Sequence, residues 1–567
     1  MQVGTPRWIR SRNIQELLIW GVIAVVVFWR LGYVSLLDPD EAHYAQLTRE
    51  MIRARQWLIP TLDGLPFIDK PVLYHWLQAA AESLFGENEF ALRLPSALAA
   101  VGLIWTVRWI GQSFAGRSAG NWAALFFATT PLTFALSSIG VFDMLYTAFL
   151  FGAVSCLLVA ASTSHRRLEY VGWLLLALAV MTKGPVALIL AVLFGIALVV
   201  RRDTRPLVLN LRWDLGLLLV ALIASPWFLY MTMTFGRRFV RDYMLGGNLY
   251  YFTRPASFSS RDGGLLFYVR SYFGGCFPWS LLLVAAAIDT WRTRRMLSPV
   301  ERALWVWIAL ILVFFSIAGF KLDTYIFPAV PATGLVLAAA WQFDARRELP
   351  KAMTAGLWVI ALVFAVAGTL LWTTMFSIDL ELSPVAILLP WALIVGGMIL
   401  GWQLYRHREQ RAAGLLIAVL LCVYGVVVVE GLPVLERSRP TAPLGRWIAR
   451  HAPADTPIGV YGLDDWRGSI RFYSRRRLVV LHDQSEVRDF FDRHPDSFAL
   501  MLARDYRRLR SDGLSLGAVG GRRAIVGRSG KYIRKQIWDR IIVTTPPSVD
   551  AELITSDLAL SRELKDE

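Results

Sequence analysis

The sequence has few charged residues and few of the residues that build disulfides or metal sites. Only 18% of its 567 residues are charged, whereas soluble globular domains contain about a quarter. Its three cysteines, Cys156, Cys276 and Cys422, lie in apolar stretches without a Cys-x-x-Cys motif. This argues against disulfides and against a structural zinc site.

Two further signals are missing. The histidines, among them His43, His75, His451 and His482, share no metal-ligand spacing. No glycine-rich phosphate loop stands at a strand–helix junction, and GAVGG at 517–521 is predicted to be a turn. The sequence therefore gives no sign of a nucleotide-binding enzyme of the P-loop or dinucleotide type.

Long apolar runs dominate what is present. The chain is 56% hydrophobic with a mean hydropathy of +0.47, and apolar runs of about 20 residues, the length of one membrane crossing, recur along it. We therefore predict a polytopic α-helical membrane protein. The net charge of +16 is mostly arginine and is expected in cytoplasmic loops and beside the anionic lipids of the membrane, not on nucleic acid.

The apolar runs predict a transmembrane domain, residues 1–433, of about thirteen helices. The first run, read as a retained helix and not as a cleaved signal, is followed by twelve others. Two of them, 168–182 and 184–201, are short and could be broken or tilted. The predicted spans are 14–36, 90–113, 117–135, 140–162, 168–182, 184–201, 212–233, 270–289, 300–319, 322–342, 352–375, 384–404 and 412–432.

Basic residues collect in alternate loops between these spans. Such loops face the cytoplasm, so we predict a cytoplasmic N-terminus and place residues 434–567 on the outer side, together with loops 37–89 and 234–269. The basic segments are RWIRSR before the first span, HRR at 165–167, RRDTR at 201–205, WRTRR at 291–295, ARR at 345–347 and RHREQR at 406–411.

Residues 434–567 have the pattern of a small soluble α/β domain. Short apolar segments alternate there with charged ones, as expected of strands between helices. The strand candidates are 457–464, 469–474, 477–482 and 497–502, and the stretch from about Pro546 is polar and expected to be loosely ordered.

The first outer loop carries three carboxylates in DPDE, residues 38–41. Asp38 before Pro39, with Glu41 three residues later, is typical of a capping box that opens a helix through Ala54. This helix is amphipathic and is expected to lie on the membrane surface. The cap leaves Asp40 unused, with Tyr44 on the same helix face.

A second charged motif, Asp69-Lys70-Pro71, follows in the same loop. Proline forces the residue before it into an extended or turn geometry, and an aromatic helix is predicted from about Val72. An isolated Asp–Lys pair is usually a solvated ion pair of little consequence.

Several motifs in one order resemble a known family. They are similar to those of the bacterial polyprenyl-phosphate-dependent glycosyltransferases of the GT-C class, and most similar to the aminoarabinose transferases that modify lipid A (the ArnT type). The motifs are DPDEAHYAQLTREM at 38–51, FIDKP at 67–71, FDMLYTAF at 142–149, MTKGPVAL at 181–188, ASPWF at 224–228 and GFKLDTYIFP at 319–328.

The resemblance implies an inverting glycosyltransferase of the bacterial inner membrane. Its donor would be a sugar on undecaprenyl phosphate, best matched by 4-amino-4-deoxy-L-arabinose, and its acceptor lipid A or a related glycolipid. Cleavage of a sugar–phosphate bond develops positive charge on the sugar and negative charge on the phosphate, so fixed charges of both signs are required. By resemblance, Asp40 belongs at the reacting centre, as base or positioning group, and Lys70 at the carrier phosphate.

Other residues are candidates for binding donor or acceptor. Each also has a plainer explanation: a buried helix start, a lysine reaching to the headgroups, or a solvated basic loop. We assign to binding Glu41, Tyr44, Lys183, Arg237, Arg241, Arg254, Lys321 and Tyr325. Asp69 and Asp143 could together hold a divalent cation, although two carboxylates do not specify a metal.

Three departures leave the substrate open. The chain has AHYAQ where the aminoarabinose transferases show an Arg-Tyr-Ala-Glu pattern, DKP in place of EKP, and KLDTY in place of a KLPTY-like run. Hexose transfer, galacturonic acid transfer and protein mannosylation therefore remain alternatives. A lipid-linked sugar transporter, which would place ionisable residues across the midplane and show repeat symmetry, and an assembly scaffold are the alternatives outside this class.

Overall fold

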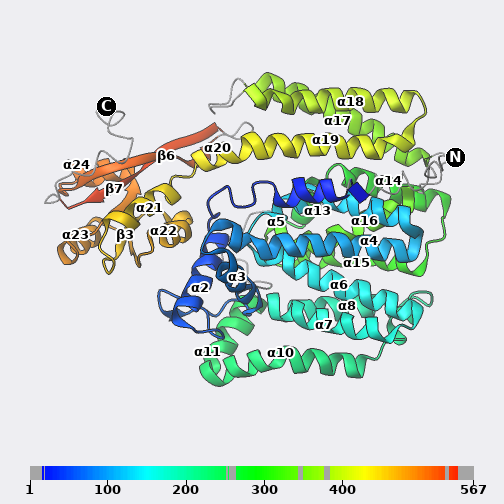
Figure 1. The fold of residues 1–567 in the computed structure, drawn as a ribbon, viewed down its shortest axis with the longest axis horizontal. Helices are drawn as coiled ribbons and strands as arrows, with labels where there is room; N and C mark the ends of the chain where they lie inside the picture. Colours follow the sequence, from blue (N-terminus) through cyan, green and yellow to red (C-terminus); the bar gives the residue numbers. More distant parts are fainter. Residues whose placement is uncertain are drawn as a thin grey trace, which may run out of the picture.

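The computed structural model describes residues 16–17, 19–250, 253, 264–341, 349–375, 384–529 and 535–546. A bundle of long helices forms the larger part, and a smaller domain containing strands sits at one end of it (Figure 1). The helices α2 and α3 of the first outer loop lie at that same end, beside the small domain. The segment beginning at Ile19 starts at the opposite end of the bundle.

Within the described ranges, eight helices are long and apolar enough to cross a membrane, or nine if the bent pair α13 and α14 forms one span. Thirteen spans were predicted. The difference has three sources: two apolar helices, Ile19–Phe28 and Val186–Val199, are short; Arg166–Lys183 is not among the eight; and two predicted spans are joined in α4. The number of crossings therefore stays a prediction.

The helices of the membrane part follow one another with short connections. They are η1 (Ala24–Phe28), α4 (Glu89–Ala128), α5 (Pro131–Ser137), α6 (Phe142–Thr163), α7 (Arg166–Lys183), α8 (Val186–Val199), α9 (Pro206–Leu209), α10 (Trp213–Phe235), α11 (Arg237–Phe239), η2 (Val240–Tyr250), α13 (Phe267–Gly275), α14 (Trp279–Thr293), α15 (Pro299–Ile317), η4 (Asp323–Ala329), α16 (Val330–Trp341), α17 (Lys351–Met375), η5 (Pro384–Ile387), α18 (Leu388–Tyr405), η6 (Glu409–Arg411), α19 (Ala412–Val426), η7 (Val427–Gly431) and α20 (Leu432–Arg437).

Glycine makes the turn inside α4. Gly116 has φ 84° and ψ 169° and interrupts the helical geometry, a conformation that other residues rarely adopt. The two arms then pack closely, because a Cβ added to Gly111 would lie 2.8 Å from the Cα of Gly120. The arms correspond to the predicted spans 90–113 and 117–135.

The first outer loop contains two helices and a small hairpin. They are α2 (Asp40–Ala54), β1 (Thr61–Leu62), β2 (Leu65–Pro66) and α3 (Leu73–Phe85). Both helices occupy the predicted ranges. The buried side of α2 includes Arg49, which was expected on the polar face but is only 3% exposed.

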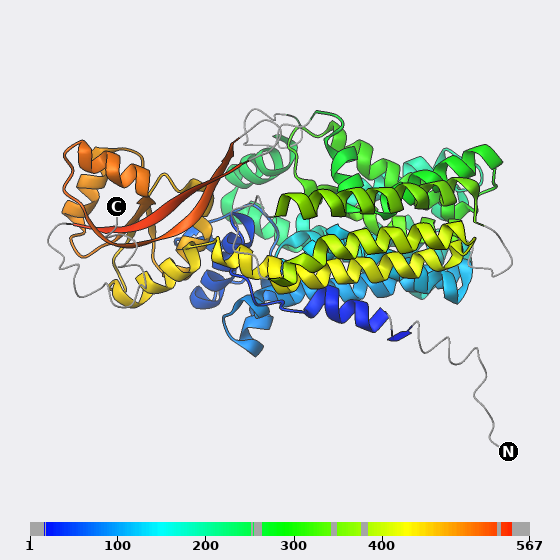
Figure 2. The ribbon, with the colours of Figure 1, turned by 90° about the horizontal axis from the view of Figure 1, so that it is seen from above.

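The C-terminal domain is a five-stranded mixed sheet in the order β4-β3-β5-β7-β6. Strands β4, β3 and β5 are parallel, and β7 and β6 continue the sheet antiparallel. Figure 2 shows the long β6–β7 ribbon reaching toward the helical bundle. Its elements are α21 (Thr441–His451), β3 (Ile458–Tyr461), η8 (Asp464–Trp466), α22 (Arg467–Ser474), β4 (Leu478–Leu481), α23 (Gln484–Arg493), β5 (Ala499–Leu502), α24 (Ala503–Ser511), β6 (Gly517–Ser529) and β7 (Lys535–Thr545).

Two local predictions in this domain are wrong. Residues 469–474 form part of the helix α22, because Ile470 and Tyr473, three residues apart, are both buried on one helical face. Residues 517–521 are not a turn but the start of β6, paired with β7. The other three strand candidates are confirmed as β3, β4 and β5, and the stretch after Pro546 lies outside the described residues.

The predicted cap of α2 is also wrong. Asp38 does not cap α2. Its carboxylate instead accepts hydrogen bonds from the backbone N–H of Ser469, at 2.7 Å, and from the Ser469 hydroxyl, and it pairs with Arg439 at 3.3 Å. DPDE is thereby held by α22 of the C-terminal domain, which packs against α2.

Candidate active site

Asp40, the first residue of α2, lies among four charged side chains. It is exposed to solvent, yet protein surrounds enough of it to change its ionisation. Loss of hydration raises the pKa of this carboxyl above its ordinary value of 3.8, and the nearby charges of Asp143, Lys70, Asp69 and Lys183 modify it further. The two aspartates raise the pKa and the two lysines lower it.

The four neighbouring charges form two ion pairs from different parts of the chain. Lys70 Nζ lies 2.8 Å from Asp69 Oδ1 in the first outer loop. Lys183 Nζ, at the end of α7, lies 2.7 Å from Asp143 Oδ1 in the first turn of α6. The lysine and aspartate side chains are 13% to 28% exposed, so both pairs are partly accessible. We call Asp40, Asp69, Lys70, Asp143 and Lys183 the charged cluster.

Aromatic residues line the charged cluster. Lys183 Nζ lies 4.5 Å from the centre of the Tyr325 ring and 5.4 Å from that of Tyr146, distances at which a cation is attracted by a ring face. Tyr44 packs edge-on against Phe142, with ring centres 4.5 Å apart. Burial and the charge of Asp40 hold the pKa of the Tyr44 hydroxyl well above 10, so it stays a neutral hydrogen-bond donor.

This arrangement can separate charge. The charged cluster contains three carboxylates and two ammonium groups, so positive charge developing on a substrate can be met by Asp40 and negative charge by a lysine. Such groups act most strongly where they are fixed before the reaction and partly shielded from water. Lys70 pairs directly with Asp69, and it reaches Asp40 only through its charge.

The residues proposed for a metal do not fit one. Asp69 and Asp143 each already pair with a lysine, whose positive charge competes with a cation. Among the residues that the structure describes, no group of three or more His, Cys, Asp or Glu side chains has the geometry to hold a metal ion. We therefore derive no step through a metal.

Glu41 lies apart from the charged cluster and has no spare binding capacity. It is 1% exposed and forms a two-pronged ion pair with Arg93, at 2.6 and 2.8 Å. It also accepts backbone hydrogen bonds from Leu37 and Gly140. The expectation that Glu41 binds donor or acceptor therefore loses its support, and Glu41 belongs to the framework that holds the loop.

Lys321 is likewise committed to the framework. It is buried, with 8% exposed, and donates to the carbonyl oxygens of Phe315 and Ser316, at 3.2 and 2.7 Å. These carbonyls end α15, where a cation is favourable. The neighbouring Tyr325 is the residue of this motif that contacts the charged cluster, through Lys183.

The second long outer loop contributes exposed arginines. Arg241 is 72% exposed and pairs with Asp242 at 2.7 Å, and Arg237 is also exposed. Their segment does approach the charged cluster, because a Cβ added to Gly247 would lie 3.9 Å from Asp69 Oδ1. Arg254 lies outside the described residues.

Sequence reasoning missed the residues that position the loop. Arg93, Arg439 and Ser469 hold Glu41 and Asp38, but they lie 52 to 431 residues away in sequence. Arg93 alone gave a signal, as a single charge near the start of an apolar run, where an ionisable residue usually has a partner.

The fold is that of a known class. It matches the crystal structure of ArnT from Cupriavidus metallidurans bound to undecaprenyl phosphate, with a TM-score of 0.72, 19% identity and coverage of 94% of this chain and 98% of that one. The archaeal oligosaccharyltransferase AglB from Archaeoglobus fulgidus matches with a TM-score of 0.51, 13% identity and coverage of 86% and 69%. The chain thus has the GT-C fold of membrane-embedded glycosyltransferases, with a C-terminal α/β domain.

Sequence comparison gives the family. The family described as dolichyl-phosphate-mannose-protein mannosyltransferase matches residues 69–230. The undecaprenyl phosphate-α-4-amino-4-deoxy-L-arabinose arabinosyl transferase 1 of Sodalis glossinidius is 30% identical over 70% of this chain and 72% of its own length. The corresponding transferase of Shewanella sediminis is 26% identical over 80% and 83%. The chain belongs to this family of polyprenyl-phosphate-dependent arabinosyl transferases.

Proposed function

We propose that this protein transfers 4-amino-4-deoxy-L-arabinose from undecaprenyl phosphate to lipid A or a related envelope glycolipid, with inversion at the anomeric carbon. The relatives named for this donor support the sugar and the carrier. The observation that carries the proposal is the position of Asp40 among two aspartates and two lysines at the outer end of the bundle.

The chemistry follows from the charges of the cluster. An acceptor oxygen forms a bond to the anomeric carbon of the sugar while the bond from that carbon to the phosphate oxygen breaks. The electron pair of the broken bond leaves with undecaprenyl phosphate, whose negative charge is met by Lys70 or Lys183. If the acceptor is a hydroxyl, Asp40 takes its proton; if it is an ionised phosphate, Asp40 orients it and the sugar.

The carrier's apolar chain needs a surface near the charged cluster. A cavity of about 270 Å³ lies between α3, α7 and α10, lined by apolar and aromatic side chains including Leu73, Trp76 and Met181. Leu73 is three residues from Lys70, and Met181 is two residues from Lys183. A polyprenyl phosphate can therefore place its phosphate at the lysines and its first isoprene units in this cavity.

The orientation follows from the charge of the loops. We infer an inner-membrane protein with a cytoplasmic N-terminus and with the charged cluster and C-terminal domain in the periplasm, because basic loops remain on the cytoplasmic side. The contact between Asp38 and Ser469 supports placing the first loop and the C-terminal domain on the same side.

Transfer in proteoliposomes tests the proposal. The purified protein is supplied with radiolabelled sugar on undecaprenyl phosphate, and lipid A is extracted and counted. We expect transfer by the wild type and by an Asp455→Asn control on the exposed surface of the C-terminal domain. Asp40→Asn and Lys70→Ala should abolish it. Equal transfer by all four proteins would overturn the mechanism, and transfer of only another sugar would overturn the assigned substrate.

A further inference from the structure

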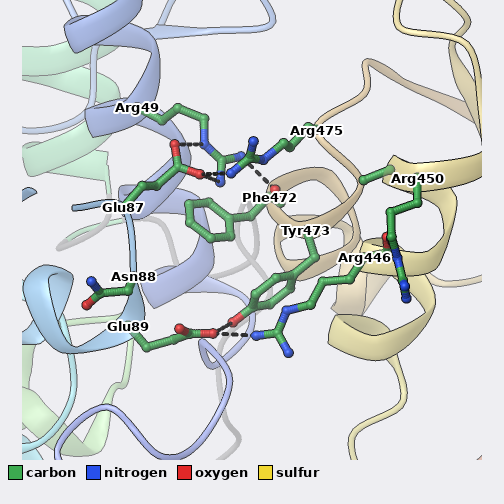
Figure 3. Close-up of a pocket in the computed structure, with 10 residues that line it drawn as sticks. Arg49, Glu87, Asn88, Glu89, Arg446, Arg450, Phe472, Tyr473 and Arg475 are labelled. Carbon is green, nitrogen blue, oxygen red and sulfur yellow. Dashed lines mark hydrogen bonds and ion pairs between the residues drawn. The ribbon is translucent and has the colours of Figure 1, made fainter.

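A second polar cavity lies where the C-terminal domain meets the first outer loop. It has a volume of about 520 Å³ and lies between residues 87–89, which lead into α4, and the helices α21 and α22 (Figure 3). This volume is in the range of small-molecule sites. The charged residues on its walls are Arg49, Glu87, Glu89, Arg446, Arg450 and Arg475.

Positive charge exceeds negative charge on these walls. Four arginines face two glutamates, which leaves a formal net charge of +2. Figure 3 shows two ion-pair groups: Glu87 with Arg49 and Arg475, and Glu89 with Arg446. The glutamates hold the arginines in place across the two domains without neutralising all of them.

Several guanidinium nitrogens remain available for a ligand. Arg450 is exposed, and among the described residues its only contact is a 3.4 Å hydrogen bond from Nε to the carbonyl oxygen of Arg446. Arg446 and Arg475, both 52% exposed, each use one terminal nitrogen in an ion pair. Since a guanidinium carries five N–H donors in a planar fork, such a set is suited to the oxygens of a phosphate group.

The edge of the cavity is apolar. Leu84, Phe85 and Phe90, just outside residues 87–89, are 78%, 51% and 36% exposed. They flank the start of α4, which is long and apolar enough to enter the membrane. A basic cavity beside exposed apolar side chains at the end of a membrane-crossing helix fits an anionic headgroup whose acyl chains stay in the bilayer.

We propose that this cavity binds a phosphate group of the lipid acceptor, at a place separate from the charged cluster. Arg49 is nine residues after Asp40 on α2, or about 13 Å along the helix axis at about 1.5 Å per residue. This inference rests on the proposed function for the identity of the acceptor. The cavity serves as an anchor that holds one phosphate while another part of the same headgroup reaches Asp40.

Arg450 is the residue to change, because its side chain forms no ion pair with the described residues and the fold does not depend on it. The full-length protein in lipid nanodiscs is titrated with radiolabelled lipid A, with enzymatically dephosphorylated lipid A and with inorganic phosphate. Arg450→Glu reverses the charge, Arg450→Lys retains it, and Arg507→Glu on the exposed face of α24 makes the same change away from the cavity.

We expect Arg450→Glu to weaken binding of lipid A about tenfold or more, as expected for a lost charge-assisted contact to phosphate. Arg450→Lys should retain most of the affinity, and Arg507→Glu all of it. Dephosphorylated lipid A should not distinguish wild type from Arg450→Glu. Equal affinity of Arg450→Glu and wild type for lipid A would overturn the inference, and so would inorganic phosphate binding as tightly as lipid A.

Binding also separates this inference from the proposed function. Asp40→Asn should bind lipid A normally and transfer no sugar. If Arg450 governs lipid A binding and the wild type transfers nothing to lipid A, the proposed function fails and the phosphate site stands. If transfer to lipid A occurs and Arg450→Glu leaves both affinity and transfer unchanged, the phosphate site fails alone.

Discussion

Asp40 and Glu41 are neighbours at the start of α2, but their surroundings differ in kind. Asp40 is exposed to solvent and lies among two aspartates and two lysines that are paired with each other. Glu41 is buried, and its two oxygens are taken by Arg93 and by two backbone N–H groups. One residue along the helix separates the charged cluster from the framework.

Their ionisation differs in the same way. Loss of hydration, and next the charge of Asp143, raise the pKa of Asp40. Burial would also raise the pKa of Glu41, but the charge of Arg93 and the hydrogen bonds to Glu41 hold it below its ordinary value of 4.5. A carboxylate with complete partners is structural, whereas one that is partly shielded and incompletely partnered can meet a substrate.

The largest expected effect is the loss of activity on replacing Asp40. Asp40→Asn should lower the initial rate of sugar transfer by about a thousandfold or more, within the range for a group that handles a proton or stabilises the transition state. Its thermal unfolding temperature should not fall, because Asp40 holds no described residue in place. A drop in that temperature would assign Asp40 to the framework instead.

Replacing Glu41 should have the opposite profile. Glu41→Gln leaves Arg93 buried without its counter-charge, which costs about 3 to 5 kcal/mol of stability. The unfolding temperature should drop, and the double variant Glu41→Leu/Arg93→Met should recover much of it. A stable Glu41→Gln protein that transfers no sugar would move Glu41 into the reacting site and remove the contrast with Asp40.

The ion pair between Lys183 and Asp143 should have an intermediate effect. Lys183→Met removes a cation from the charged cluster and leaves Asp143 uncompensated, and we expect transfer to fall by about a hundredfold, as for loss of one stabilising group. Lys321→Met is the matched control within the outer loops, and its effect should be on stability. Lys183→Arg should restore part of the activity. Wild-type rates in Lys183→Met would exclude it from the site.

Acid should reduce activity before it reduces stability. As the pH falls, Asp40 takes up a proton at a higher pH than an ordinary aspartate, within the field of Asp143, Lys70, Asp69 and Lys183, and transfer is lost. A carboxyl with a raised pKa binds protons more readily in the folded state, so its protonation does not destabilise the fold. Glu41 has a lowered pKa, and its contribution to stability is lost only as the pH falls below 4.5 through that lowered value.

Rate and unfolding temperature measured side by side from pH 8 to pH 5 test this difference. The rate should fall while the unfolding temperature changes little. Parallel loss of the two would mean that the acid effect is structural and does not report on Asp40.

The contact between the two domains should give the smallest effect. Ser469→Ala removes the hydroxyl that donates to Asp38 but leaves the backbone hydrogen bond. A loss of about 1 kcal/mol corresponds to about a fivefold lower kcat, with KM unchanged, because Asp38 only positions the turn before Asp40. A change confined to KM would contradict this positioning role.

Sequence reasoning succeeded where the signal is local. The helix from Asp40 to Ala54 follows from its proline and acidic start, and the Asp69–Lys70 pair follows from adjacency. The strands β3, β4 and β5 follow from short apolar segments. Each of these depends on a few neighbouring residues.

It failed where a partner from a distant part of the chain decides the structure. A capping box predicts that Asp38 bonds to its own helix, but the backbone of Ser469 competes for it from 431 residues away. Arg49 looks polar on a helical wheel, but Glu87 and the Phe472 ring, 3.6 Å from its guanidinium carbon, enclose it. Local pattern contains no information on such contacts.

One measurement tests the contrast at Asp40 most directly: binding and transfer in the same Asp40→Asn protein. Affinity for undecaprenyl phosphate is determined by titration in nanodiscs, and a single turnover from preloaded donor to lipid A is followed in parallel. We predict affinity within a factor of about two of wild type, because the lysines remain, and loss of the single turnover. A normal single turnover in Asp40→Asn would contradict the account.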